Sequence, residues 1–481
     1  AIVIVLIYVF RLFDLQIMTD DYKKNADSNA FLNKIQYPSR GAIYDRNGKL
    51  LVFNQPAYDI TFVPREVTQL DTLDLCSALN ITREQFDKRM KDVKNRWMNP
   101  GYSKYTHQVF MTQLSAEECG VFQEKLFKFP GFYIQRRTIR QYTYNSAGHL
   151  LGDIGEVSKK DIENDDYYIR GDYIGKQGIE KSYEKYLRGE KGVEILLRDA
   201  HGRIQGHYMD GQLDRSSVPG KNLTLGIDID LQMLGERLLQ HKIGAIVAIE
   251  PATGEILCMV SSPTFDPHLM IGRQRGKNHR LLQMDKRKPL LNRAIMGAYP
   301  PGSTFKTASI MVALEDGKIT PDTEVDTGNG IMNMYGSKMR DHNWHRGGYG
   351  KIDVTRILEV SSNVGVSYLI DKHYKDNPQK FVDGLKRMSI DQPLHLQIPG
   401  EGKPNIKGPK ERYFAKTTLP WMSIGYETQV PPMNILTFYN AIANNGVMVR
   451  PKFVKAAVKD GEVVKEYPTE VINPKICSDH T

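Results

Sequence analysis

The sequence predicts an α+β fold with more than one domain. Residues 244–262 read as two apolar strands around the turn Pro251-Ala252-Thr253-Gly254, and helical patterns precede and follow them. A buried antiparallel hairpin with helices on either side is typical of an α+β domain in which helices pack on a central sheet. The 481 residues are enough for two or three domains.

Composition narrows the class of protein. A formal net charge of +9 permits a nucleic-acid partner. However, the sequence has no zinc-finger spacing and no aromatic-basic RNA motif, and the basic run at 272–288 reads as a solvated loop. We therefore expect no nucleic acid, while the mild positive charge suits an anionic membrane or wall. The four cysteines are far apart and form no Cys-x-x-Cys or Cys/His cluster, so we expect neither a metal nor a cofactor.

Residues 1–18 are expected to be a partial transmembrane or juxtamembrane segment. Residues 1–10 are apolar, but a bilayer needs about 20 such residues, and Arg11 and Asp14 interrupt the run. We interpret the segment as the outer part of a truncated membrane helix, with Arg11 near the interface. A signal-peptide remnant is the alternative, although no small-residue cleavage pattern follows.

Residues 19–218 are expected to form an elongated, mixed α/β domain. Asn47-Gly48 is a strong two-residue hairpin signal because both residues tolerate positive φ, and apolar residues alternate on both sides of it. Further along the domain, the pattern predicts helices at 70–94, 115–129 and 178–189 and mixed short elements over 132–208.

Residues 219–481 are expected to form the second domain, which begins at the linker Pro219-Gly220. A helix at 230–240 leads into the hairpin described above. A second helix follows Pro300-Pro301-Gly302 and ends at Gly317. Its middle is apolar nearly all round, so we expect a buried central helix.

Ser303 and Lys306 stand at the start of that helix. Serine is a favoured N-cap, but a capping box would place Glu or Gln where Lys306 stands. A partly buried ammonium beside the positive end of the helix dipole has a lowered pKa, so a neutral amine becomes accessible and can take the serine proton. The backbone N–H groups there can bind an oxyanion. A second Ser-x-x-Lys, Ser182 to Lys185, lies on a charged helix and reads as two solvated side chains.

Residues 354–374 carry a second candidate motif. Two apolar helical runs are interrupted by Ser361-Ser362-Asn363. The group reads as a polar hinge between two helices, or as side chains that face the first site. In the second reading Ser361 relays a proton, and Asn363 holds the lysine and a substrate amide. The pattern is weak alone and much stronger about 60 residues after a Ser-x-x-Lys.

These residues resemble the penicillin-binding proteins and serine β-lactamases. Four longer segments narrow the resemblance to a class B penicillin-binding protein: SRGAIYDRNGKLL, GKQGIEKSYEKYLRGEKG, GAIVAIEPATGEILCMVSSPTFDP and LLNRAIMGAYPPGSTFK. The resemblance implies a non-catalytic pedestal, or dimerisation, domain at 19–218. It also implies a transpeptidase domain of the penicillin-binding protein/β-lactamase fold, with a helix-flanked antiparallel sheet, at 219–481.

The resemblance further implies a peptidoglycan D,D-transpeptidase. Ser303 would be the nucleophile, with its backbone N–H in the oxyanion hole, and Lys306 the general base. Ser361 would relay the proton, and Asn363 would orient Lys306 and the substrate. The partners would be stem peptides ending in D-Ala-D-Ala, β-lactams and a polytopic membrane glycosyltransferase. The protein would be anchored by one helix in the bacterial inner membrane, with its catalytic domain in the periplasm.

Two features depart from the family pattern. The third motif, Lys-Thr-Gly or Lys-Ser-Gly, does not occur in the sequence, so we expect a chain truncated at both ends and weakly active or inactive as it stands. Up to about Lys306 the chain resembles the elongation type, penicillin-binding protein 2. From about Thr307 it is more similar to the division type, which suggests a mosaic. The alternatives are a D,D-carboxypeptidase or β-lactamase, and a non-catalytic penicillin sensor or scaffold.

Overall fold

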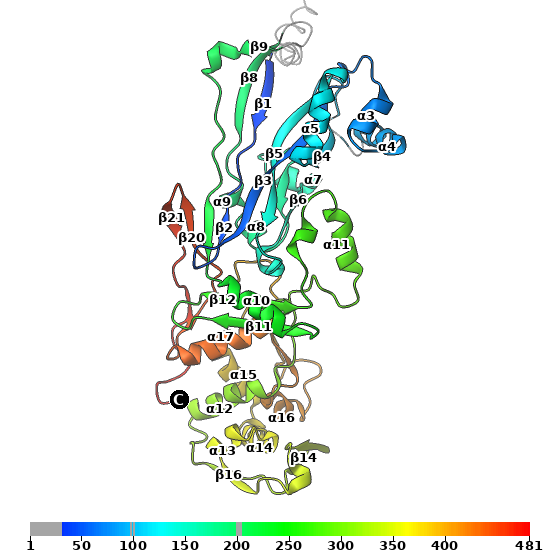
Figure 1. Cartoon of the computed structure of the whole chain (residues 1–481). Helices are drawn as coiled ribbons and strands as arrows, with labels where there is room; N and C mark the ends of the chain where they lie inside the picture. The colour runs from blue at the N-terminus through cyan, green and yellow to red at the C-terminus, as the bar shows by residue number, and fades with distance from the viewer. Residues whose placement is uncertain (1–30, 97–98, 100–101, 199–203) are drawn as a thin grey trace, which may run out of the picture. The chain divides into compact units, whose positions relative to one another are not determined.

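The computed structural model describes residues 31–96, 99, 102–198 and 204–481 (Figure 1). The predicted membrane segment at 1–18 lies outside this range. No helix within it is both long and apolar enough to cross a bilayer. The chain divides into unit 1 (1–42, 54–139 and 185–222) and unit 2 (43–53, 140–184 and 223–481). Four elements continue from one unit into the other: β3 (Leu50–Phe62), β5 (Phe132–Tyr142), α9 (Glu184–Leu187) and β10 (Asn222–Leu225).

The described part of unit 1 contains two groups of strands, the helices α3, α4 and α5, and most of α9. Strands β1, β8 and β9 form one antiparallel sheet, in which Phe31 faces Leu197 and Gln36 faces Gly192. Strand β3 pairs with β4 and β5. The elements are β1 (Phe31–Gln36), β3 (Leu50–Phe62), α3 (Thr72–Ala78), α4 (Arg83–Lys94), β4 (Gln108–Leu114), α5 (Ala116–Lys125), η2 (Leu126–Lys128), β5 (Phe132–Tyr142), β8 (Gly192–Arg198), β9 (Ile204–His207) and η3 (Tyr208–Gly211).

Two capping boxes explain where the helices of unit 1 begin. The Thr82 and Ser115 side chains accept from the backbone N–H groups of Gln85 and Glu118, whose side chains in turn accept from the cap residues. The predicted helix at 70–94 is therefore two helices, because Thr82 starts a new one. The apolar faces of all three helices join a core around the rings of Phe62, Phe110 and Phe132.

Unit 2 begins with the predicted Asn47-Gly48 hairpin. Strand β2 (Ile43–Tyr44) pairs with the start of β3, and Gly48 has a φ of +80°. Asp45 Oδ1 accepts from the N–H groups of Asn47 and Lys49, both at 2.8 Å, which fixes the turn. Parallel pairing joins β10 (Asn222–Leu225) to β2, and β20 (Val454–Lys459) and β21 (Glu462–Glu466) follow beyond β10.

The predicted apolar hairpin is present as β11 (Gly244–Ile249) and β12 (Ile256–Ser262). Helix α10 (Ile229–Leu238) packs on β12 and helix α17 (Pro432–Ala443) on β11, which confirms the α+β prediction. The expectation that both strands are covered on both faces is correct for β12 only. All six residues of β11 remain half-exposed, and within the described part of the chain the strand pairs with β12 alone.

The largest core of unit 2 surrounds α12 (Lys306–Glu315). This is the predicted buried helix, and it packs against α14 (Asn363–Tyr374) and α15 (Pro378–Arg387). The contact with α15 is close because Gly384 has no side chain: a Cβ atom there would lie 2.4 Å from Val312 Cγ1. Gly317, with a φ of +62°, follows the end of α12 as predicted.

The remaining elements of unit 2 are short. Three two-stranded sheets, β6–β7, β13–β16 and β14–β15, are antiparallel, as are the pairs β17–β18 and β19–β22. Their bounds, with those of the helices, are α6 (Gly148–Leu151), β6 (Ile154–Glu156), α7 (Lys159–Asn164), β7 (Tyr173–Gly175), α8 (Gly178–Ser182), α9 (Glu184–Leu187), η4 (Pro267–Met270), α11 (Arg275–Met284), η5 (Gly302–Phe305), β13 (Glu324–Asp326), β14 (Ile331–Met334), β15 (Ser337–Arg340), η6 (Trp344–Arg346), β16 (Lys351–Asp353), α13 (Val354–Glu359), β17 (Asn405–Ile406), α16 (Thr418–Ser423), β18 (Thr428–Gln429), β19 (Met448–Val449) and β22 (Val471–Asn473).

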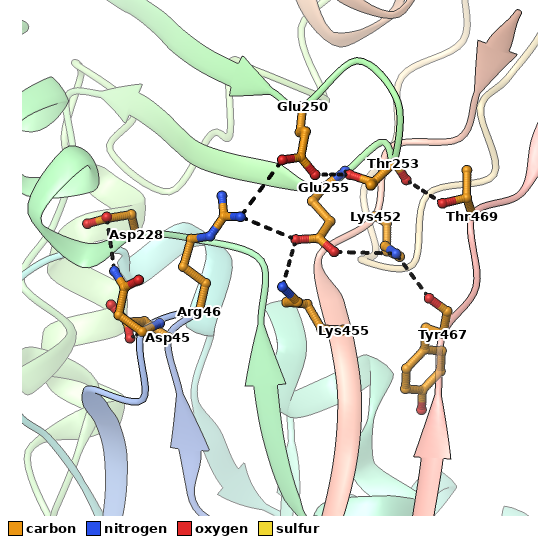
Figure 2. A network of polar contacts seen from close by, with 11 residues as sticks. Asp45, Arg46, Asp228, Glu250, Thr253, Glu255, Lys452, Lys455, Tyr467 and Thr469 are labelled. Atoms are coloured by element: carbon orange, nitrogen blue, oxygen red, sulfur yellow. Dashed lines mark hydrogen bonds and ion pairs between the residues drawn. The ribbon is translucent and has the colours of Figure 1, made fainter. Parts of the chain in front are cut away.

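A charge network around the buried Glu255 carboxylate ties three segments of unit 2 together (Figure 2). The Glu255 carboxylate lies 3.8 Å from Arg46, 3.6 Å from Lys452 and 3.2 Å from Lys455. Arg46 also lies 4.0 Å from Glu250. We call these five residues the Glu255 cluster. It joins the turn after β2, the turn between β11 and β12, and strand β20 with the residues before it.

Candidate active site

Ser303 lies in a short 3₁₀ turn that precedes the buried helix. The turn is η5 (Gly302–Phe305), and α12 begins at Lys306 without a side-chain cap. The N-cap interpretation of Ser303 is therefore wrong: its hydroxyl makes no hydrogen bond within the described part of the chain. The physical reason is the tight 3₁₀ winding, in which the Lys306 N–H already donates to the Ser303 carbonyl. The Ser303 side chain is exposed and free to react.

The backbone around Ser303 is held by a neighbouring loop. The Gly302 N–H donates to the Gly425 carbonyl at 3.1 Å. Gly425 has a φ of +81°, and a Cβ atom there would lie 2.1 Å from the Gly302 oxygen, so only glycine fits. Within the described residues the Ser303 N–H has no acceptor, which is usual for the first N–H groups of a helix. This N–H can therefore bind an oxyanion.

Lys306 is buried, and within the described part of the chain its amine bonds only to neutral groups. Its side chain leaves the residue 2% exposed. The amine Nζ donates to the Ser361 carbonyl at 2.6 Å and to Ser361 Oγ at 3.0 Å. Burial lowers the pKa of Lys306 to about 8, against a smaller opposing effect from the Asp341 carboxylate. The direction agrees with the prediction from sequence.

Ser361 reaches Lys306 from a strained position between two helices. It follows α13 (Val354–Glu359) and has a φ of +53°, a left-handed conformation that is uncommon outside glycine. The Ser361 N–H donates to the Leu358 carbonyl at 3.1 Å. Glycine would adopt this conformation at lower cost, and the serine that stands here instead places its hydroxyl 3.0 Å from Lys306 Nζ. The predicted polar hinge and the predicted functional motif are thus the same residues.

Asn363 is the first residue of α14 and is half-buried. Its Nδ2 donates to the Arg340 carbonyl at 2.8 Å, and no hydrogen bond to Lys306 is found in the described part of the chain. The structure therefore brings Lys306 and Ser361 together directly and places Asn363 at the next turn. The role of Asn363 in orienting the lysine or a substrate stays a prediction.

Asp341 is a site residue that the sequence did not reveal. It is 1% exposed and directly follows β15 (Ser337–Arg340). Its carboxylate accepts from Ser362 Oγ at 3.0 and 2.9 Å and from the Val364 N–H at 3.0 Å. Nothing marks Asp341 in sequence, because it stands in a polar stretch 21 positions before Ser362.

Among the described residues no group of three or more His, Cys, Asp or Glu side chains could hold a metal ion.

Comparisons with known proteins identify the family of the chain. The family "Penicillin-binding Protein dimerisation domain" matches residues 35–225, and "Penicillin binding protein transpeptidase domain" matches 244–479. The peptidoglycan D,D-transpeptidase MrdA of Acinetobacter baumannii is 30% identical over 95% of this chain and 68% of its own length. MrdA of Escherichia coli K12 is 29% identical over 95% of this chain and 73% of its own length.

A solved structure has the same fold. It is a complex between penicillin-binding protein 2 and MreC from Helicobacter pylori, with a TM-score of 0.75 and 22% identity, and the match covers 92% of this chain and 81% of that one. The MrdA relatives align on both sides of Thr307 and support the elongation type. The division-type resemblance after Thr307 and the limits 1–18, 19–218 and 219–481 stay predictions. The chain belongs to the class B penicillin-binding proteins, among the peptidoglycan D,D-transpeptidases of cell-wall synthesis.

Proposed function

We propose that Ser303 carries the acyl group in the transpeptidase reaction. The observation that carries this proposal is the environment of Lys306, which is buried, bonded only to Ser361 and one helical turn from Ser303. A neutral amine has two N–H groups and one lone pair. The Ser361 carbonyl and hydroxyl accept both N–H groups, so the lone pair is left for the Ser303 proton.

The reaction then proceeds in two acyl transfers. Ser303 Oγ attacks the carbonyl of the penultimate D-alanine while its proton passes to Lys306 Nζ, and the Ser303 N–H stabilises the oxyanion. The bond to the terminal D-alanine breaks, and the D-alanine amine leaves with a proton from Lys306 through the Ser361 hydroxyl. An amine of a neighbouring stem peptide attacks the acyl-serine, returns its proton through the same groups and frees Ser303. Asn363 orients the substrate amide.

Membrane anchoring and partners belong to the same proposal. The relatives are cell-wall enzymes, which is consistent with a protein of the cell envelope. We propose a single membrane helix formed by the apolar start of the chain, and a periplasmic catalytic domain. We also propose a polytopic membrane glycosyltransferase as the partner that supplies glycan strands. β-Lactams would acylate Ser303 because they mimic the D-Ala-D-Ala end of the stem peptide.

Labelling with a fluorescent penicillin tests the proposal. In the full-length protein, Ser303→Ala should lose covalent labelling entirely, because no nucleophile remains. Ser182→Ala is the matched control: Ser182 opens the second Ser-x-x-Lys, is exposed on α8, and should label like the wild type. Equal labelling of the Ser303→Ala and wild-type proteins would refute the proposal.

The lifetime of the acyl-enzyme separates the proposal from its alternatives. A transpeptidase should release the penicilloyl group slowly, since its site is built for an amine acceptor and not for water. Loss of the label within seconds would indicate a β-lactamase. Release of D-alanine from a stem peptide without a crosslinked product would indicate a carboxypeptidase, and labelling without either product would indicate a sensor.

A further inference from the structure

We infer that the buried carboxylate of Asp341 is a positioning residue, which holds the junction between α13 and α14 so that Ser361 faces Lys306. The inference rests on the proposed roles of Ser303 and Lys306. Asp341 contacts neither residue by a hydrogen bond. It acts through Ser362, the neighbour of Ser361 in the chain.

Asp341 contacts the start of α14 through its carboxylate. A carboxylate that is 1% exposed is costly unless donors surround it. Here the donors are the Ser362 hydroxyl and the Val364 N–H. Ser362 also caps α14, because its Oγ accepts from the Gly365 N–H at 2.9 Å. The carboxylate thus binds both the cap residue and a free N–H of the first helical turn, where the helix dipole favours a negative charge.

Ser362 is connected through the backbone to the Ser361 carbonyl, which contacts Lys306. The Ser361 carbonyl and the Ser362 N–H belong to one planar peptide group. The Ser362 N–H donates to the Ile357 carbonyl at 2.9 Å, and the Ser361 carbonyl accepts from Lys306 at 2.6 Å. Fixing the Ser362 side chain on Asp341 therefore fixes the plane that presents the Ser361 carbonyl. If Ser362 lost its hydrogen bond to Asp341, Ser361 would relax from its strained left-handed conformation.

Asp341 is itself held by the β14–β15 hairpin. It follows the hairpin of β14 (Ile331–Met334) and β15, and its N–H donates to the Gly330 carbonyl at 2.9 Å. At the turn of this hairpin the Tyr335 hydroxyl lies 3.1 Å from both carboxylate oxygens of Asp371, on α14. The hairpin is thus bonded to α14 at its turn, through Tyr335, and at its end, through Asp341. These two contacts hold Asp341 in place.

The charge of Asp341 gives the inference a second readout. Lys338 and Arg340 lie on β15, Glu315 on α12 and Asp371 on α14. Among the described residues, Asp341 is the charged group that acts on the pKa of Lys306, and it raises this pKa against the larger effect of burial. The acylation rate of the wild type should rise as the pH increases through about 8, because Lys306 becomes neutral there. Removing the Asp341 charge lowers the pKa of Lys306 further, so this rise should move to lower pH.

The experiment compares rates of acylation by a fluorescent penicillin across pH 6–10 in the full-length protein. Asp341→Asn keeps the size of the side chain and its acceptor oxygen. We expect its pH profile to move to lower pH, with a loss at the plateau of less than about tenfold. Asp341→Ala also removes the anchor for Ser362, and we expect a loss of about 10²-fold at every pH.

Asp371→Asn is the matched control, because it removes a carboxylate that bonds the same hairpin from the same helix without acting on Lys306. Its pH profile should stay at about 8. An Asp341→Asn protein that folds, and whose profile and plateau match the wild type, would overturn the inference. If Asp341→Ala does not fold, Asp341→Asn alone decides. Unchanged labelling of Ser303→Ala would instead mean that the proposed function has failed.

Discussion

Two lysines of unit 2 are almost fully buried, and their surroundings differ in kind. Lys306 is 2% exposed and Lys452 is 8% exposed. Lys452 lies 3.6 Å from the Glu255 carboxylate and donates to the Tyr467 carbonyl at 3.0 Å. Lys306 has no salt bridge within the described residues and donates only to the carbonyl and hydroxyl of Ser361.

The difference shows how one residue type serves two purposes. The Glu255 carboxylate at ion-pair distance balances the charge of Lys452, so this lysine is suited to holding strands and turns together. Neutral acceptors do not compensate for the loss of water around a charge, so burial lowers the pKa of Lys306 to about 8. The more distant Asp341 only moderates this effect. The lysine that lacks an ion-pair partner is the one that can act as a base.

Replacing each of the two lysines by arginine should separate their roles most clearly. Arginine does not deprotonate in proteins, so Lys306→Arg should reduce acylation by a fluorescent penicillin by about 10³-fold or more. Lys452→Arg keeps a cation near Glu255 and should acylate within about twofold of the wild type. Comparable losses in the two variants would mean that Lys306 acts as a cation and not as a base.

Neutralising Glu255 should affect stability and leave the chemistry alone. Glu255→Gln leaves Arg46, Lys452 and Lys455 without their shared carboxylate. Because Arg46 and Lys455 are partly exposed, we expect a loss of about 1–3 kcal/mol in the free energy of unfolding in urea. Glu250→Gln removes a half-exposed charge 4.0 Å from Arg46 and keeps an oxygen that can accept from Thr253 Oγ1, so it should cost less than about 0.5 kcal/mol. Equal losses would show that burial of Glu255 is not what matters.

A smaller effect is expected where α17 supports the nucleophile turn. The Tyr439 hydroxyl donates to the Thr304 carbonyl at 2.8 Å and lies 3.0 Å from Thr307 Oγ1. Tyr439→Phe removes both hydrogen bonds, and we expect about a two- to tenfold loss in acylation rate with little change in melting temperature. Tyr413→Phe, at a residue 73% exposed, is the control and should change neither. An unaltered rate in Tyr439→Phe would show that η5 holds its shape without this support.

Local signals were enough to predict much of the fold. Asn47-Gly48 makes its turn because both residues accept positive φ, and the apolar run after Lys306 makes a buried helix because no face of it is polar. These features depend on residues that are near neighbours in the chain. The same signals could not show that β11 remains half-exposed, because the cover of a strand depends on how far a helix from a distant segment reaches.

The candidate site divides along the same line. The sequence alone marks the candidate residues, since a lysine where a capping box has Glu or Gln and a Ser-x-Asn between two helices are local anomalies. Only the tertiary structure decided that Ser303 is not a cap, that Ser361 takes both hydrogen bonds of Lys306, and that Asp341 supports the junction. Lys306 and Ser361 are 55 positions apart. Such partners are set by the packing of α12 against α14, which no periodicity records.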